Sequence, residues 1–360
     1  MVKKVKKAIQ YIRKNGVTFA VRAVCVKMRQ KTGGKLPLVS VVMPVYNVEP
    51  YLEQALDSLL NQSMKHFELI AVDDGSTDHS LDILNRYAAS DQRIEVYTQK
   101  NQYAGVARNT GLSHARGEYV IFLDSDDFFE KTLLQETYYK AKMNQADIIL
   151  FTANNYENPT GKNWKAKGGL RKQYVPSKQP FSYKDCPETL YQMTSSPPWT
   201  KMYRREFIVS NGLQYQALYN ANDVYFTFTA LALAKKIVTL DKALVNYRIG
   251  LKTNLQSSTK RYFYEAYRAW HEKLREIGVL DEVRRSYVNR ALEGCMYNLR
   301  AVADPDKKRE VYEMLKNEGF EALEIYGHEE SYFYNKAHYE TLRMIQNESF
   351  ETYMEAYGNS

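Results

Sequence analysis

The sequence is poor in cysteine and has no long apolar run. Its three cysteines, Cys25, Cys186 and Cys295, lie far apart in a chain of 360 residues, without the spacing of metal ligands. This sparse, odd count argues against a disulfide scaffold or a structural zinc site, and we expect buried thiols. No segment approaches the roughly 18 to 20 uninterrupted apolar residues that span a bilayer. The basic start also lacks the apolar stretch of a secretory signal, so we expect a cytoplasmic protein.

Residues 1–48 contain no acidic side chain but hold eleven lysines and arginines. The whole chain has a net charge of +8, so the rest of it, with 39 basic and 42 acidic residues, is slightly acidic. An enzyme that binds nucleic acid more often carries its positive charge on the working domain. We therefore expect no nucleic-acid partner.

Residues 1–31 place apolar side chains at helical spacing, which predicts two short amphipathic helices, with a linker up to residue 35. Their basic faces suit a peripheral contact with the anionic inner surface of the cell membrane. The same pattern fits a helix pair packed on its own catalytic domain, with the lysines in solvent. The sequence leaves both possibilities open.

Strands alternate with helices from Leu38 onwards. Strands are predicted at 39–45, 67–72, 94–98, 119–123 and 147–151, and helices at 51–61, 78–89, 106–115 and 131–144. This alternation predicts an α/β fold with a mainly parallel sheet flanked by helices. Ligands of such sheets bind beyond the carboxyl ends of the strands.

The rest of the chain divides into a polar stretch and a helical region. Residues 152–184 are rich in Gly, Lys and Asn and are predicted as loops, and a helix is predicted at 223–233. Beyond residue 257 apolar and aromatic side chains keep helical spacing. We therefore expect a catalytic domain at 36–256 and a helical C-terminal region at 257–360.

Four carboxylic acid and hydroxyl side chains follow the predicted strand at 119–123, in the order Asp124-Ser125-Asp126-Asp127. Carboxylates gathered at a strand end repel one another unless a cation or hydrogen-bond donors offset them. Mn²⁺ and Mg²⁺ bind through one or two carboxylates together with substrate phosphates. An acidic turn that caps the next helix is the alternative.

Three further polar segments precede this one. Asp73 and Asp74 end a strand and can accept hydrogen bonds from a base or a ribose, and Tyr46 offers a ring for stacking after the first strand. Arg108 opens the helix before the acidic strand, where it could meet a diphosphate or form a structural ion pair.

Together the four segments resemble the family 2 glycosyltransferases with their GT-A fold. The resemblance runs from about Val39 to Asp127, over V-S-V-V-M-P-V-Y-N, V-D-D-G-S-T-D, A-R-N and G-E-Y-V-I-F-L-D-S-D-D. It implies that Tyr46 contacts the donor base, that Asp73 and Asp74 bind it by hydrogen bonds, and that Asp124 lies near the ribose. It also implies that Asp126 binds the metal. Pro44, Arg108 and Ser125 complete the implied donor site.

The second half matches the family less closely. The family usually has an acidic pair before an apolar helix, and here Asn222 takes one of the two positions, which leaves Asp223 as the candidate base. A helix N-cap is the alternative role for Asp223. On the acceptor side Trp199 is a candidate sugar platform in a loop, with Lys201 and Asp127 beside it. A loop from Tyr247-Arg248 to residue 258 is expected to close over the diphosphate.

The implied reaction is transfer, with inversion, of a hexosyl or N-acetylhexosaminyl group from a nucleotide sugar, most often a UDP-sugar. The acceptor is a glycan or lipid-linked hydroxyl in bacterial surface polysaccharide synthesis. Two alternatives stay open: a non-catalytic nucleotide-sugar-binding or scaffold protein, which Asn222 favours, and a metal-dependent nucleotidyltransferase. The first strand is followed by residues 44–50 without Gly or Lys, which argues against the phosphate loop of the latter.

Overall fold

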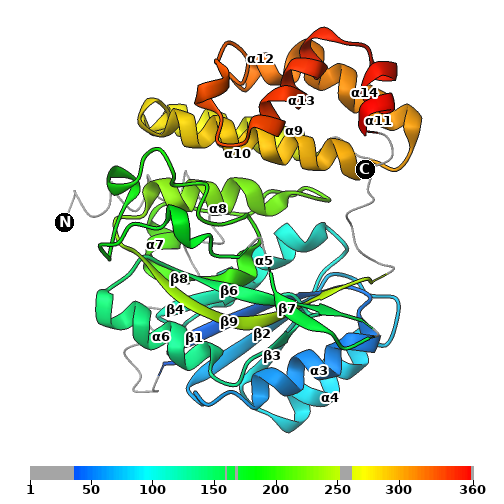
Figure 1. Cartoon of the computed structure of the whole chain (residues 1–360). Coiled ribbons are helices and arrows are strands. Elements are labelled where there is room, and N and C mark those ends of the chain that lie inside the picture. The colour runs from blue at the N-terminus through cyan, green and yellow to red at the C-terminus, as the bar shows by residue number, and fades with distance from the viewer. Residues whose placement is uncertain (1–35, 159, 167–168, 252–261, 358–360) are drawn as a thin grey trace, which may run out of the picture.

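A computed structural model describes residues 36–360 apart from 159, 167–168, 252–261 and 358–360. The expected N-terminal helices, the linker before residue 35 and most of the expected closing loop lie outside these residues. One mixed sheet runs through the described part of the chain in the order β3-β2-β1-β4-β8-β6-β9-β5, with β7 paired to β6 (Figure 1).

The first half of the sheet is parallel and agrees closely with the predicted alternation. Its elements are β1 (Val39–Val45), α3 (Glu49–Leu60), β2 (Phe67–Asp73), α4 (Ser80–Ser90), β3 (Ile94–Thr98), α5 (Tyr103–His114) and β4 (Tyr119–Phe122). β1 pairs in parallel with β2 on one side and β4 on the other. Every residue of β1 is buried, as expected for a β-branched strand covered on both faces.

The second half inserts antiparallel strands. Its elements are β5 (Phe128–Phe129), α6 (Leu133–Asn144), β6 (Ile148–Glu157), β7 (Asn163–Lys165), β8 (Lys201–Arg204), α7 (Arg205–Ser210), α8 (Asn222–Leu233) and β9 (Ile237–Ile249). β8 is antiparallel to both β4 and β6, whereas β6 and β9 are parallel. Each parallel register is longer than any antiparallel one, so the prediction of a mainly parallel sheet is confirmed.

The prediction of loops throughout 152–184 was wrong, because β6 continues to Glu157 and pairs with β7. The extension is polar and has no apolar alternation to reveal it. Its amides pair across the sheet instead: Asn154 and Asn163 both donate to the side-chain oxygen of Asn246, at 3.2 and 3.0 Å.

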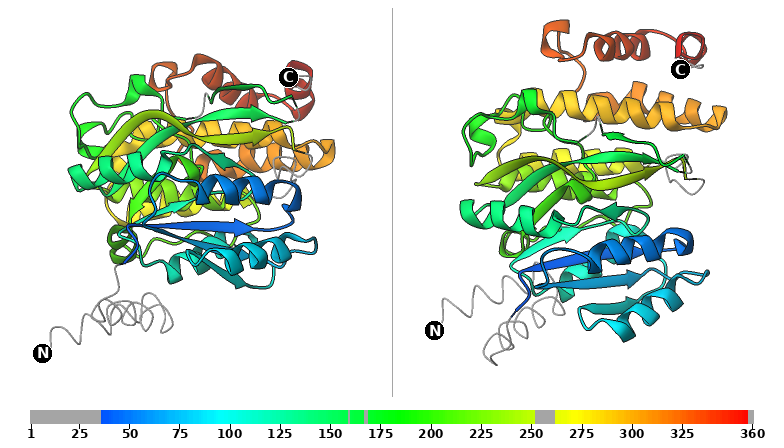
Figure 2. Two further views of the ribbon diagram at one scale, coloured as in Figure 1. Left: turned by 90° about the horizontal axis from the view of Figure 1, so that it is seen from below. Right: turned by 60° about the horizontal axis from the view of Figure 1, so that its bottom comes forward.

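The sheet separates two hydrophobic cores. One contains side chains of α3, α4 and α6, and the other contains side chains of α5, α8 and the C-terminal helices. These last are α9 (Tyr262–Glu276), α10 (Leu280–Ala301), α11 (Pro305–Met314), α12 (Phe320–Ala322), α13 (Lys336–Asn347) and α14 (Phe350–Tyr357). They form a layer next to α8, on the side away from α3 and α4 (Figures 1 and 2).

The helical C-terminal region therefore shares a hydrophobic core with α5 and α8 of the α/β half. Trp270 of α9 packs against Phe228 of α8 with ring centroids 4.7 Å apart. The expected boundary at 256/257 falls in the undescribed range 252–261. None of the helices in the described ranges combines the length and apolar character of a membrane-spanning segment.

Candidate active site

The predicted site segments meet at one edge of the sheet. In the parallel register Val45 lies beside Asp73, and Val42 lies beside Phe122. The backbone N–H of Asp74 donates to the carbonyl of Val45 at 2.8 Å, which ties the two strand ends together. Because parallel strands end on the same side, Asp73 at the end of β2 lies at the same edge as Tyr46 and Asp124, which follow β1 and β4.

The loops after β1 and β2 are joined by polar contacts. The N–H of Asn47 donates to the Ser76 hydroxyl at 3.1 Å, and the N–H of Thr77 donates to the Asn47 side-chain oxygen at 2.8 Å. Tyr46 stands beside these contacts with 47% of its surface exposed, so its ring is open to a flat ligand. Pro44, in contrast, is buried within β1.

Asp73 and Asp74 are both buried and hydrogen-bonded. The Asp73 carboxylate accepts from the N–H groups of Gly75 and Ser76 at 3.2 and 3.3 Å, and so shapes its own turn. Gly75 has φ +78°, a backbone conformation that favours glycine. Asp74 accepts from the Gln99 side chain at 2.7 Å, and burial raises its pKa.

Arg108 connects the donor side of the site to α8. Its guanidinium donates to a carboxylate oxygen of Asp124 at 2.6 Å and to the side-chain oxygen of Asn222 at 2.9 Å. Only 6% of Arg108 is exposed. Of the two roles left open for this arginine, the structure shows the ion pair with the acidic turn.

Asn222 thus has a defined partner at the position where the family commonly has an acid. It is 7% exposed, and its amide N–H₂ donates to the carbonyl of Leu218 at 3.2 Å. Gly105 permits the close approach of this segment to α5, since a Cβ there would lie 2.2 Å from the carbonyl oxygen of Gln216 and 3.1 Å from the Asn222 Cβ. The Asn222 side-chain oxygen accepts this hydrogen bond without adding a negative charge.

The acidic turn is electrostatically crowded. Burial and the neighbouring Asp124 charge raise the pKa of Asp126 to about 6. Burial and the charges of Asp126 and Asp124 also raise the pKa of Asp127 well above its ordinary value. One Asp127 oxygen accepts from the N–H of Arg248 at 2.9 Å, while the other is buried without a hydrogen-bond partner. A cation at this turn would offset the repulsion.

Within the described ranges no three His, Cys, Asp or Glu side chains converge as metal ligands. A cation that takes one or two carboxylates and fills its shell with phosphate and water oxygens, as Mg²⁺ commonly does, would find such carboxylates in this turn. Ser125, also in the turn, is buried. Asp127 is completely buried, which does not agree with its predicted place on the acceptor side.

Arg248 is the site residue whose role the sequence did not reveal. It belongs to β9, not to a closing loop, and is buried. Its Nε donates to the carbonyl of Asp126 at 2.8 Å, and its guanidinium lies 5.0 to 5.4 Å from the ring centres of Tyr51, Phe128 and Tyr156. Together with its N–H bond to Asp127, this contact holds the acidic turn against β9.

Asp223 lies in the first turn of α8, and the N-cap position belongs to Ala221. The N-cap role considered for Asp223 is therefore wrong. Ala221 has φ +54°, a left-handed conformation that is costly for a residue with a Cβ and recurs at functional sites. Burial raises the pKa of Asp223, against the opposing charges of Arg108 and Lys201. A raised pKa suits a general base that must also release its proton.

The predictions that Trp199 and Lys201 face the acceptor need correction, because both side chains are buried. Trp199 is in a short 3₁₀ turn, is only 8% exposed, and stacks on Tyr247 with ring centroids 5.0 Å apart. Lys201 is the first residue of β8 and is completely buried. Burial lowers the pKa of its ammonium to about 7. Neither side chain presents an open surface to a sugar.

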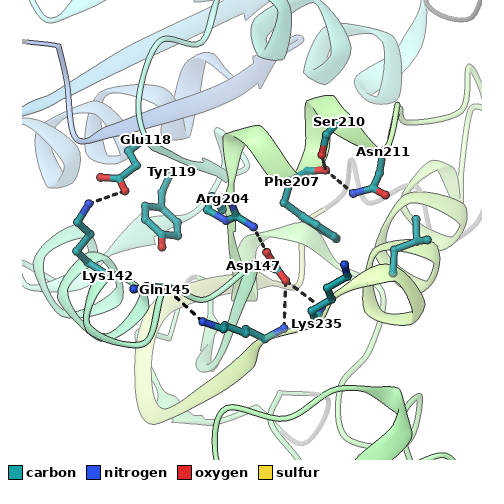
Figure 3. Close-up of a pocket in the computed structure, with 12 residues that line it drawn as sticks. Glu118, Tyr119, Lys142, Gln145, Asp147, Arg204, Phe207, Ser210, Asn211 and Lys235 are labelled. Carbon is teal, nitrogen blue, oxygen red and sulfur yellow. Dashed lines mark hydrogen bonds and ion pairs between the residues drawn. The ribbon is translucent and has the colours of Figure 1, made fainter. Parts of the chain in front are cut away.

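A cavity of about 740 Å³ lies at the opposite end of β4 and contains none of the predicted site residues. Figure 3 shows its charged lining, in which Lys142 pairs with Glu118 at 2.7 Å and Arg204 pairs with Asp147. Asp147 also accepts from the backbone N–H of Lys235 at 2.9 Å. These groups satisfy one another, so the candidate active site is the carboxyl edge of the sheet.

Comparisons with known proteins agree with this choice. The family model described as Glycosyl transferase family 2 matches residues 40–209. EpsH of Bacillus subtilis (strain 168) is 32% identical over 301 residues, which cover 79% of this chain and 82% of EpsH. The poly(ribitol-phosphate) beta-glucosyltransferase of Bacillus spizizenii is 34% identical over 204 residues, 55% of this chain and 30% of that protein.

A solved structure shows the same fold. The crystal structure of S. aureus TarS 1-349 in complex with UDP-GlcNAc superposes with a TM-score of 0.61 at 22% identity, covering 88% of this chain and 92% of that one. At this identity the likeness concerns the fold, which is GT-A. The family match, the extent of the EpsH relationship and the placement of the four motifs at one sheet edge lead to the same conclusion: the chain belongs to glycosyl transferase family 2, and it is a glycosyltransferase.

Proposed function

We propose that the chain transfers a sugar, with inversion, from a UDP-sugar to a hydroxyl group, using Asp223 as the base. The contact that carries this proposal is the Arg108 bridge, because one buried guanidinium joins Asp124 of the donor side to Asn222, the neighbour of Asp223. It supports a geometry in which the leaving group and the base face one sugar from two sides.

The donor proposal rests on Tyr46 and on the relatives. An exposed ring beside two buried carboxylates suits a base that stacks and accepts hydrogen bonds at its edge. TarS was solved with UDP-GlcNAc, and the Bacillus spizizenii relative is a glucosyltransferase by name. We therefore propose a hexosyl or N-acetylhexosaminyl donor linked to UDP.

Asp126 is the proposed ligand of Mn²⁺ or Mg²⁺, with Asp124 close by. A cation held there would offset the charge that develops on the departing nucleoside diphosphate. Asp223 accepts the proton of the acceptor hydroxyl as its oxygen attacks the anomeric carbon. A single displacement inverts that carbon, and no covalent enzyme intermediate is needed.

The proposed acceptor is a glycan or a lipid-linked glycan of a bacterial surface polysaccharide, as the names of relatives suggest. The protein is proposed to work in the cytoplasm, with residues 1–31 making a peripheral membrane contact.

UDP release from UDP-glucose, UDP-galactose and UDP-N-acetylglucosamine, measured with Mn²⁺ or Mg²⁺ and with water as acceptor, tests the proposal. The Asp126→Ala and Asp223→Asn variants are each expected to lose at least about 100-fold in rate. Near wild-type release by either variant would contradict its assigned role. A wild-type protein that binds a donor but never releases UDP would instead support the alternative of a non-catalytic binding protein. Asn222 is no longer an argument for that alternative, because its side-chain oxygen accepts a hydrogen bond from Arg108.

A further inference from the structure

Tyr103, the first residue of α5, has a strained backbone. Its φ of +71° lies in the left-handed region, which glycine adopts freely but which strains a residue with a bulky side chain. Strain of this kind persists only where the surrounding structure fixes it, and it recurs at binding and catalytic sites. A glycine here would remove the strain but also the ring, so the ring is the feature that the sequence retains.

Asp74 lies between Tyr103 and Tyr46. On one side its backbone N–H donates to the carbonyl of Val45, the residue before Tyr46, at 2.8 Å. On the other side its carboxylate accepts from the backbone N–H of Gln102, the residue before Tyr103, at 3.0 Å. Both tyrosines are partly exposed. The buried Asp74 carboxylate is therefore flanked by two aromatic side chains that a ligand can reach.

The loop that leads from β3 to Tyr103 is packed against the turn after β2. The N–H of Gln99 donates to the carbonyl of Asp73 at 2.9 Å. A Cβ on Gly75 would lie 3.1 Å from the backbone nitrogen of Asn101, so the two loops touch. These contacts fix the backbone that carries Tyr103 relative to the two carboxylates of the proposed donor site.

Tyr219, in the segment before α8, supports the ring of Tyr103. The ring centroids are 5.3 Å apart and the ring planes are nearly perpendicular, at 89°, which is a favourable edge-to-face contact. Tyr219 is also partly exposed. The two rings form an aromatic wall that begins beside Asp74 and continues onto the segment that leads to Asp223.

The segment before α8 is held on α5 without the aromatic wall. The side chain of Asn109 exchanges two hydrogen bonds with the backbone of Tyr215, both at 2.8 Å. Arg108 donates to Asn222 at the other end of the segment, at 2.9 Å. Holding this segment in place therefore does not explain why a tyrosine is kept in a strained conformation at the start of α5.

We propose that the aromatic wall of Tyr103 and Tyr219 binds the nucleoside of the donor, across Asp74 from Tyr46. The inference rests on the proposed UDP donor. A nucleoside has a flat base and a ribose with C–H groups on its faces, and both gain from contact with partly exposed aromatic rings. Aromatic rings on two sides of a buried carboxylate suit a base that stacks and donates a hydrogen bond from its edge.

The test measures UDP binding with Mn²⁺ by titration calorimetry, in the wild type and in variants of the aromatic wall. Tyr103→Gly removes the ring together with the strain, so UDP should bind about tenfold more weakly while Tm does not fall. Tyr219→Ala leaves the Tyr103 ring without its support and should also weaken binding. Tyr103→Phe keeps the ring and should bind UDP within about twofold of wild type.

Gln145→Gly is the matched control, because Gln145 also has a left-handed backbone, with φ +50°, and lines the distant cavity. This variant should bind UDP as the wild type does. Binding by both Tyr103→Gly and Tyr219→Ala within about twofold of wild type would overturn the inference. If Tyr46→Ala weakens binding while these two variants do not, the aromatic wall alone is refuted. A wild type that binds no UDP refutes the proposed donor, and the inference with it.

Discussion

Replacing Arg108 by methionine is the perturbation that most directly tests how the site is held together. The substitution keeps an unbranched side chain in the same buried space but removes both hydrogen bonds of the guanidinium. The Asp124 carboxylate and the Asn222 side-chain oxygen then lose a donor at the same time. Both the stability of the protein and the rate of transfer should fall.

The size of the stability loss follows from burial. Removing one partner of a fully buried ion pair costs about 3 to 5 kcal/mol. The Asp124 side chain is 27% exposed, so solvent recovers part of that loss. Asn222 adds a buried oxygen without a donor, at about 1 to 3 kcal/mol. We expect a total of about 3 to 5 kcal/mol, since the two losses overlap.

Urea unfolding of the wild type, Arg108→Met and Arg108→Lys measures this loss. Arg108→Lys keeps the charge but not the fork that reaches two acceptors, so an intermediate value is expected. Arg86→Met, which breaks an exposed ion pair with Glu53, is the matched control and should cost at most about 1 kcal/mol. If Arg108→Met lowers the free energy of unfolding no more than Arg86→Met does, then the contacts of Arg108 with Asp124 and Asn222 do not hold the site together.

Two further predictions concern the C-terminal helices and the donor site. Burial, with the charges of Arg275 and Arg284, lowers the pKa of His271 to about 4, so between about pH 6.5 and pH 4 the unfolded state takes up this proton and the native state does not. When the pH is lowered from 7 to 5, the free energy of unfolding of the wild type should fall by about 2 kcal/mol more than that of His271→Gln, as measured by urea unfolding. An equal fall in both proteins would contradict this. Tyr46→Ala should raise the donor KM about tenfold without lowering Tm, whereas Tyr139→Ala, at a similarly exposed tyrosine, should change neither; an unchanged KM would exclude stacking.

Local patterns were sufficient for the parallel half of the fold. The predicted bounds of β1 and β3 are those observed, because β-branched runs between polar turns are a short-range signal. The family resemblance added the identities of Tyr46, Asp73 and Asp124, and strand order brought these to one edge. The polar continuation of β6 escaped prediction because its stability comes from amides on a distant strand.

The acceptor side depended on contacts between residues far apart in the sequence. Trp199 and Lys201 were expected in a loop on the acceptor side, but both are buried, and Lys201 begins β8, which pairs with β4 and β6. Arg248 was expected in a closing loop, and its place in β9 puts it under the acidic turn instead. The local spacing of apolar residues predicts neither placement, because each depends on pairing with strands that are distant in the sequence.

The sequence by itself determined the family, the parallel sheet and the chemical character of the donor edge, because motif order and strand alternation are local properties. Only the tertiary structure decided what Arg108, Asn222 and Lys201 do. A guanidinium can pair with a phosphate or a carboxylate, and an ammonium can contact a sugar or the backbone. Which partner each one has depends on what folding brings within about 3 Å of it.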